Sequence, residues 1–181
     1  MIDIINENKL FTEKQSIRQP WLIAIVLFTC IVVLLVFGIG FYEQIILGRP
    51  FGTNPMNDNE IIISFIFALI FSIFLPLLIF TSNLQTVFTD RGIYYKYFPF
   101  INKFRIISKG NIKNYYIRKY KPILEYLGWG IRYSLKGNGI AFNTMGNIGL
   151  QLELINGKKI LFGTQMPDKI IDVMNKIMKE N

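Results

Sequence analysis

Residues Ile61–Phe80, IIISFIFALIFSIFLPLLIF, form a run of twenty residues without a charged side chain. Its only polar side chains are those of Ser64 and Ser72. As a helix it would be about 30 Å long, which matches the thickness of the hydrocarbon core of a bilayer. We therefore expect a membrane span here.

A second apolar stretch, Leu22–Phe41, is also uncharged. Trp21 and Tyr42 flank it, and amphipathic rings of this kind prefer the headgroup layers of a bilayer. A loop over 43–59, rich in turn-forming residues, separates the two stretches. The sequence thus predicts a transmembrane hairpin over 20–82, with spans at about 21–42 and 60–82.

Small residues recur every fourth position of the second span, at Ser64, Ala68 and Ser72. Residues at this spacing share one helix face and let another helix approach closely. We expect this face to pack either on the first span or on a second copy of the chain.

Residues 1–19 are polar and mixed in charge, and we expect them to form an N-terminal tail. The spacing Thr12-Glu13-Lys14-Gln15 resembles a weak capping box and predicts the start of a short helix. The segment is too long and too acidic for a signal peptide. Its three basic residues, against one in loop 43–59, favour cytoplasmic termini and an external loop. We therefore expect a multi-pass protein of the cytoplasmic (inner) membrane.

From Leu84 onward the apolar residues alternate with a period of two, which is typical of β-strands. Asn156-Gly157 is a strong hairpin signal. At the end of the chain, the helical spacing of apolar residues from Pro167 to about Lys179 predicts an amphipathic helix. Residues 83–181 should thus form a mostly-β α+β domain of about seven strands, drawn from eight candidate stretches at 84–89, 93–97, 104–108, 113–121, 130–135, 140–143, 148–154 and 158–162.

Several motifs resemble those of bacterial two-span membrane proteins of unknown function that carry a C-terminal pleckstrin-homology-like (PH-like) domain. These motifs are Gln15–Trp21 (QSIRQPW), Thr89–Tyr95 (TDRGIYY), Gly128–Arg132 (GWGIR), Gly146–Leu150 (GNIGL) and Gly157–Gln165 (GKKILFGTQ). The resemblance implies a bent antiparallel sheet, or partly open barrel, capped by the C-terminal helix and facing the cytoplasm. It implies no catalytic or binding residue.

No combination of residues indicates an enzyme. The chain has no histidine, and therefore no Ser–His or Cys–His pair, and its single cysteine is Cys30. It contains no P-loop, and Gly128-Trp129-Gly130 lacks the third glycine of a dinucleotide-binding motif. These glycines are better explained by a bend that buries Trp129. We expect a non-enzymatic protein without a metal or another cofactor.

The charge is concentrated after the second span, where sixteen Lys/Arg oppose six Asp/Glu. Such a domain favours anionic partners, although domains on the positive side of a membrane are commonly basic. The first hypothesis is a membrane-anchored module for protein interaction, scaffolding or self-association. The alternative is recognition of anionic phospholipid by a basic cluster, and nucleic acid is disfavoured because a membrane-anchored chain meets little of it. The candidate lipid-binding residues are Lys113, Arg118, Lys119 and Lys121.

The turn Gly163-Thr164 precedes the predicted C-terminal helix. We expect Thr164 to shape the entry into this helix, because threonine oxygens accept hydrogen bonds from the first free N–H groups of a helix. Helix N-termini also attract anions, so a lipid headgroup at this position is the competing interpretation.

Overall fold

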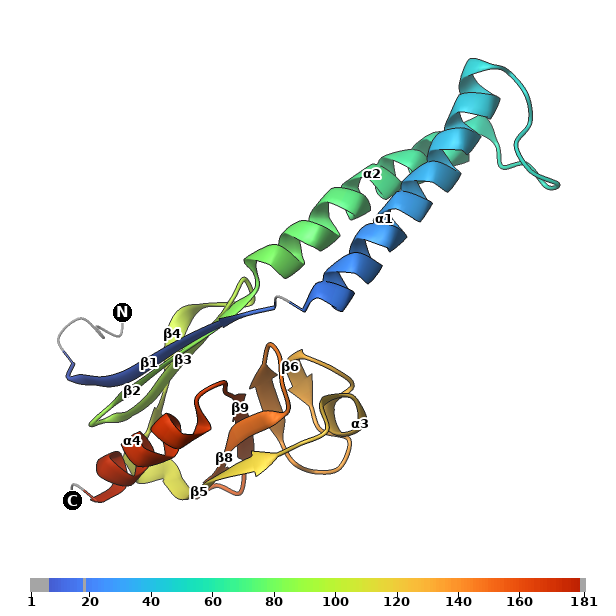
Figure 1. Cartoon of the computed structure of the whole chain (residues 1–181). Helices are drawn as coiled ribbons and strands as arrows, with labels where there is room; N and C mark the ends of the chain where they lie inside the picture. Colours follow the sequence, from blue (N-terminus) through green and yellow to red (C-terminus); the bar gives the residue numbers. More distant parts are fainter. Residues whose placement is uncertain (1–6, 18, 180–181) are drawn as a thin grey trace. The chain divides into compact units, whose positions relative to one another are not determined.

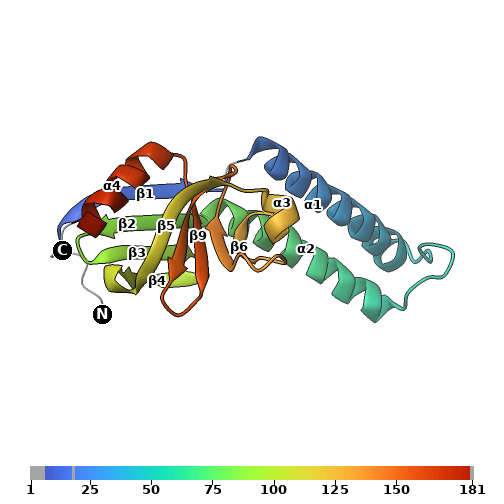
Figure 2. The ribbon, with the colours of Figure 1, turned by 90° about the horizontal axis from the view of Figure 1, so that it is seen from below.

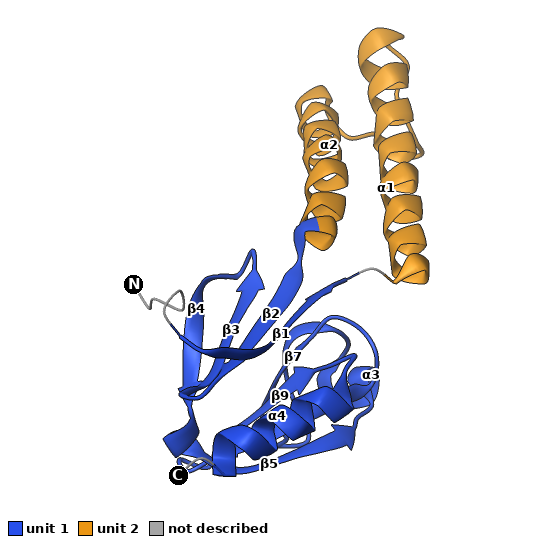
Figure 3. Cartoon of the chain, turned by 60° about the vertical axis from the view of Figure 1, so that its left-hand side comes forward, with its two compact units in different colours: residues 1–17, 81–181 blue, residues 18–80 orange. Residues whose placement is uncertain are grey.

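The computed structural model describes residues 7–17 and 19–179, which form parts of two compact units (Figure 3). One unit comprises residues 18–80. The other joins the residues up to 17 with those from 81 onward. The second unit is therefore assembled from both ends of the sequence.

The helical unit contains α1 (Pro20–Phe41), a π-helical turn (Tyr42–Ile46) and α2 (Asp58–Thr81). Both helices are long and apolar enough to cross a membrane. Asn57 and Glu60 cap α2 reciprocally, because each backbone N–H donates to the side chain of the other residue, at 3.2 and 3.0 Å.

The β-domain contains two sheets (Figure 1). The first is fully antiparallel and has the strand order β1-β2-β3-β4. The second has the order β5-β8-β9-β7-β6, in which β7 and β9 pair in parallel. The bounds are β1 (Lys9–Ser16), β2 (Asn83–Thr89), β3 (Gly92–Phe98), β4 (Ile101–Ser108), β5 (Ile112–Lys119), β6 (Gly130–Tyr133), β7 (Ile140–Asn143), β8 (Ile148–Leu154) and β9 (Lys159–Gly163).

Three short elements complete the domain: a 3₁₀ turn (Lys109–Asn111), α3 (Pro122–Tyr126) and α4 (Pro167–Lys179). α4 contacts strands of both sheets and lies beside β1 (Figure 2). Its buried residues Ile170, Met174 and Ile177 recur at helical spacing and join the core that both sheets form. The predicted amphipathic helix is confirmed.

The expected helix at Thr12 is wrong, because residues 9–16 form the strand β1. β1 pairs with β2 from Lys9↔Thr89 to Ser16↔Asn83. The ring of Phe11 lies 5.9 Å from that of Phe88, and Glu13 and Gln15 are buried. Residues 9–16 of the expected N-terminal tail therefore form a strand of the folded domain.

The strands expected after the second helix are present with bounds within three residues, although they number eight rather than about seven. The Asn156-Gly157 turn joins β8 to β9 as predicted. The sheets do not close into a barrel within the described residues. The parallel pairing of β7 with β9 and the helix α3 were not predicted.

Candidate interaction surface

Four exposed apolar side chains lie on the connection between β5 and β6 and just after β6, and we name them the apolar tip: Ile123, Leu124, Leu127 and Leu135. Each is at least 60% exposed. The N–H of Leu135 donates to the carbonyl of Glu125 at 3.2 Å, so Leu135 lies beside α3. Exposed apolar groups gathered in this way mark surfaces that meet a partner.

The backbone of the apolar tip is held in a defined shape. Pro122 begins α3. Proline suits this position because the N–H groups of the first turn have no hydrogen-bond partner within the helix. Leu127 ends the helix with φ of 60°, a left-handed conformation that costs a non-glycine residue about 1–2 kcal/mol. A strained, exposed leucine at this position gives the domain no packing benefit, which favours a functional reason for it.

A polar network attaches α3 to the second sheet. Glu125 accepts from Arg118 Nη1 at 2.9 Å, from Asn138 Nδ2 at 2.9 Å and from the N–H of Lys121 at 2.7 Å. Arg118 also donates to Gln151 Oε1 at 3.0 Å and to the Tyr126 hydroxyl at 3.0 Å. Arg118 on β5 is thus joined to α3 by its ion pair with Glu125 and to β8 by its hydrogen bond to Gln151.

Burial alone would raise the pKa of Glu125. The hydrogen bonds from the Lys121 N–H and from Arg118, together with the Arg118 charge, outweigh this effect and lower the pKa below its ordinary value. Burial also raises the pKa of the Tyr126 hydroxyl. At neutral pH the network therefore contains an ionised carboxylate and a neutral phenol.

Three exposed lysines lie within a few residues of the apolar tip in the sequence, and we name them the basic rim: Lys119, Lys121 and Lys136. Lys121 directly precedes α3, and Lys136 directly follows Leu135. Between the first two lysines Tyr120 is buried and accepts from Asn143 Nδ2 at 3.0 Å. Burial raises the pKa of the Tyr120 hydroxyl to about 12, so this side chain stays neutral.

The four residues expected to bind lipid do not lie together. Lys119 and Lys121 are exposed beside α3, whereas Arg118 is half-buried with its guanidinium bonded to three protein groups. Lys113 is exposed six residues before Lys119, or about 20 Å along β5. Two of the four residues thus contribute to the basic rim.

The entry into α4 is bound by Glu13 rather than open to an anion. Thr164 accepts from the N–H of Met166 at 2.9 Å, as its expected role requires. Its hydroxyl donates to Glu13 Oε2 at 2.9 Å, and the N–H of Gln165 donates to Glu13 Oε1 at 2.8 Å. A carboxylate of the protein therefore fills the position considered for a headgroup.

Trp129 is half-buried rather than enclosed by the protein, and its indole N–H donates to the carbonyl of Gly146 at 3.0 Å. The flanking residues Gly128 and Gly130 have φ of 121° and 119°, which only glycine adopts readily. The glycines serve a bend, as expected, and the N–H of Gly130 donates to Asn143 Oδ1 at 2.9 Å.

In the helical unit, Ala68 is buried and Ser72 Oγ donates to the carbonyl of Cys30 at 3.4 Å. Cys30 itself is buried, and Ser64 is half-buried. The face of small residues on α2 is thus the face that meets α1.

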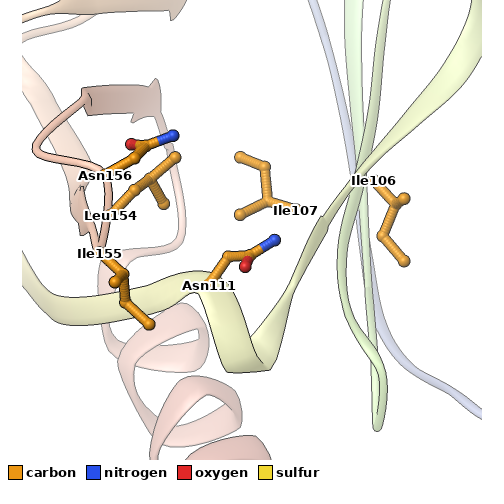
Figure 4. Close-up of a pocket in the computed structure, with 6 residues that line it drawn as sticks. All are labelled: Ile106, Ile107, Asn111, Leu154, Ile155 and Asn156. Carbon is orange, nitrogen blue, oxygen red and sulfur yellow. The ribbon is translucent and has the colours of Figure 1, made fainter.

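A shallow pocket of about 280 Å³ lies between the end of β4 and the β8–β9 turn (Figure 4). Ile107 points from β4 toward Leu154, and Ile106 lies on the other face of the strand (Figure 4). The remaining lining residues are Asn111, Ile155 and Asn156. The lining carries no ionisable side chain, and no group of three His, Cys, Asp or Glu in the described part of the chain could hold a metal ion.

Sequence reasoning missed α3, Glu125 and Glu13. α3 is too short to show a helical period. Glu13 acts through partners about 150 residues away, and the partners of Glu125 are brought together only by the fold of α3 and the loop that contains Asn138. Lys121-Pro122 was the available signal, because proline favours the first turn of a helix.

Comparison with known proteins identifies a family but no activity. The sequence pattern of a family of unknown function (DUF6141) matches residues 5–179. No curated protein matches the chain.

Proposed function

The chain belongs to this family of unknown function, and we propose that it is a non-enzymatic, membrane-anchored interaction module. In this proposal α1 and α2 span the cytoplasmic membrane, and the PH-like domain lies at its cytoplasmic face. The apolar tip and the basic rim bind an acidic surface of another protein.

The attachment of both helices to one sheet supports the anchoring. β1 precedes α1 and β2 follows α2, and these two strands are neighbours that pair as far as Ser16↔Asn83. Only Ser82 separates α2 from β2. A domain with two such connections stays at the membrane surface.

The order of elements supports a PH-like domain. An antiparallel four-stranded sheet is followed by a second sheet and then by one helix that packs on the core. The chain differs from the expected pattern in two respects, because its first strand precedes the membrane helices and its second sheet includes a parallel pair.

The apolar tip is the observation that carries the interaction role. Protein interfaces commonly combine an apolar centre with a polar rim, and this surface has both within residues 119–136. The lysines of the rim favour an acidic partner, since complementary charge speeds association and excludes wrong partners. The network around Glu125 holds the surface in shape before binding, which reduces the entropy lost on binding.

Site-specific crosslinking in native membranes tests this proposal. A photo-reactive amino acid replaces Leu124 in the full chain, and the control carries it at Ile155, which is 67% exposed on the β8–β9 turn. We expect one protein to be captured at position 124 and not at 155, through a peptide rich in Asp and Glu. The substitutions Lys121→Glu and Lys136→Glu should reduce that capture.

Equal capture at both positions would contradict the proposal, as would capture that survives the charge reversal. Capture of a second copy of this chain would assign the surface to self-association instead of an outside partner.

The second candidate is recognition of anionic phospholipid, which the exposed Lys119 and Lys121 favour. Each cation near an anionic leaflet contributes about 1 kcal/mol. If lipid is the ligand, a photo-reactive residue at 124 should label lipid in nanodiscs that contain phosphatidylglycerol. Labelling should fall when the nanodiscs contain phosphatidylcholine alone.

A further inference from the structure

The turn between β3 and β4 exposes two aromatic rings. Phe98 is 40% exposed and Phe100 is 62% exposed, with Pro99 between them. We name Phe98-Pro99-Phe100 the aromatic turn. Turns at the surface of soluble domains are usually formed by small and polar residues, so two exposed phenylalanines in one turn require an explanation.

The strand register places the aromatic turn at the end of the sheet where the chain leaves for both helices. Ser16 pairs with Asn83, and Asn83 pairs with Phe98. Neighbouring strands are about 4.8 Å apart, so Phe98 lies within about 10 Å of both strand ends. The turn and these strand ends occupy one end of the β-domain (Figure 3).

The charge around the aromatic turn fits an anionic membrane surface. Residues 92–108 contain three cations and no acidic residue. Lys103 and Arg105 are exposed on β4, and Lys96 Nζ lies 4.7 Å from the centre of the Phe104 ring. A stretch with this composition is attracted to phospholipid headgroups.

We propose that the aromatic turn is a third contact of this protein with the membrane, in which Phe98 and Phe100 insert into the headgroup layer. Aromatic side chains partition favourably into this layer, and the nearby cations pair with lipid phosphates. The inference rests on the proposed anchoring by α1 and α2. Its consequence is that the domain is fixed against the bilayer at three points and cannot rotate freely about its two connections.

Spin-label accessibility in the full chain tests this contact. Cys30→Ala removes the single cysteine, and Phe28→Cys, Phe100→Cys or Asn156→Cys then receives a nitroxide. Phe28 is an exposed residue of α1, and Asn156 is exposed on the β8–β9 turn. The protein is placed in nanodiscs that contain phosphatidylglycerol, and collisions with oxygen and with a water-soluble nickel chelate are measured.

We expect label 28 to collide with oxygen only, label 156 with the nickel chelate, and label 100 to show an interfacial value between them. If label 28 is in lipid but label 100 matches label 156, the aromatic turn does not contact the membrane, although the anchoring stands. If label 28 is also open to nickel, the anchoring fails and the inference fails with it.

A second measurement separates the rings from the label that replaces one of them. The nitroxide is placed at the exposed residue Asn102, and the native turn is compared with the double variant Phe98→Ser, Phe100→Ser. We expect the double variant to lose oxygen collisions at Asn102 and to approach the value of label 156. Unchanged collisions would show that the rings do not hold the turn in the bilayer, and would overturn the proposal.

Discussion

α4 and β1 contact each other in the same domain, but the side chains that each buries most completely are of opposite kinds. α4 buries Ile170, Met174 and Ile177 in the core. The buried side chains that β1 contributes, Glu13 and Gln15, are polar instead. Apolar packing tolerates small changes in geometry, whereas buried polar groups must find specific partners.

The partners of β1 lie at the opposite end of the sequence. Gln15 donates to the carbonyl of Gly163 at 2.7 Å and accepts from Thr144 Oγ1 at 3.2 Å. Glu13 accepts from Thr164 and from the N–H of Gln165. β1 therefore connects the two sheets, and the segment before the first helix is required for the domain that follows the second.

Removing β1 should have the largest effect. Residues 83–181 alone should fail to fold cooperatively, because β2 loses one of its two neighbouring strands and the turn before α4 loses its acceptors. Residues 7–17 joined to 82–181 by Asn-Gly should fold, because the pairing Ser16↔Asn83 is close enough for a tight hairpin. Amide hydrogen exchange of the two proteins measures the difference.

Equal protection of β2 and α4 in both proteins would show that β1 is dispensable and would remove the contrast with α4.

Ile170→Ala should have the next largest effect. Ile170 is almost completely buried in the core, and a deletion of this size typically costs about 2–5 kcal/mol in the free energy of unfolding. Urea unfolding of the domain in full-length protein in nanodiscs provides the measurement. Ile171→Ala, at a half-buried neighbour, is the matched control and should cost less.

Glu13→Ala should destabilise the domain by about 1–3 kcal/mol, since it leaves the Thr164 hydroxyl and the Gln165 N–H without their acceptor. The control is Lys14→Ala, which changes the exposed neighbour on the same strand. Hydrogen exchange at the start of α4 should increase in the first variant only. An equal response in both would mean that the carboxylate does not hold this turn.

The same contrast explains how much of the molecule could be predicted. The helices α1, α2 and α4 and the strands after Asn83 follow from apolar residues at a regular period, which the sequence displays directly. β1 was predicted as the start of a helix because Thr12-Glu13-Lys14-Gln15 has the spacing of a capping box. Its buried residues Glu13 and Gln15 are polar, so no apolar alternation revealed the strand. α3 and the Arg118–Glu125 pair were also missed, because a single helical turn shows no period and polar partners carry no regular spacing, even when they are only seven residues apart. The sequence identified the basic residues, but it could not show which of them lie close together, because that depends on how β5 pairs with β8.

The polar network at α3 should show the smallest effect, and it should depend on pH. The folded-state pKa of Glu125 is lowered, so its ionised form stabilises the fold at every pH above its unfolded pKa of about 4.3. This contribution is lost as the pH falls through the lowered folded pKa. Glu125→Gln should therefore cost about 1 kcal/mol at pH 6, because the charge-assisted bonds to Arg118 are replaced by a neutral bond. The cost should shrink toward zero in strong acid, where the wild-type carboxyl is also neutral.

Urea unfolding of both proteins in nanodiscs at pH 6 and at pH 3 measures this difference, with Glu153→Gln, at a half-buried residue of β8, as the control. A difference between wild type and Glu125→Gln that stays constant with pH would show that α3 is held by shape and hydrogen bonding alone. The ion pair would then contribute nothing to the shape of the apolar tip.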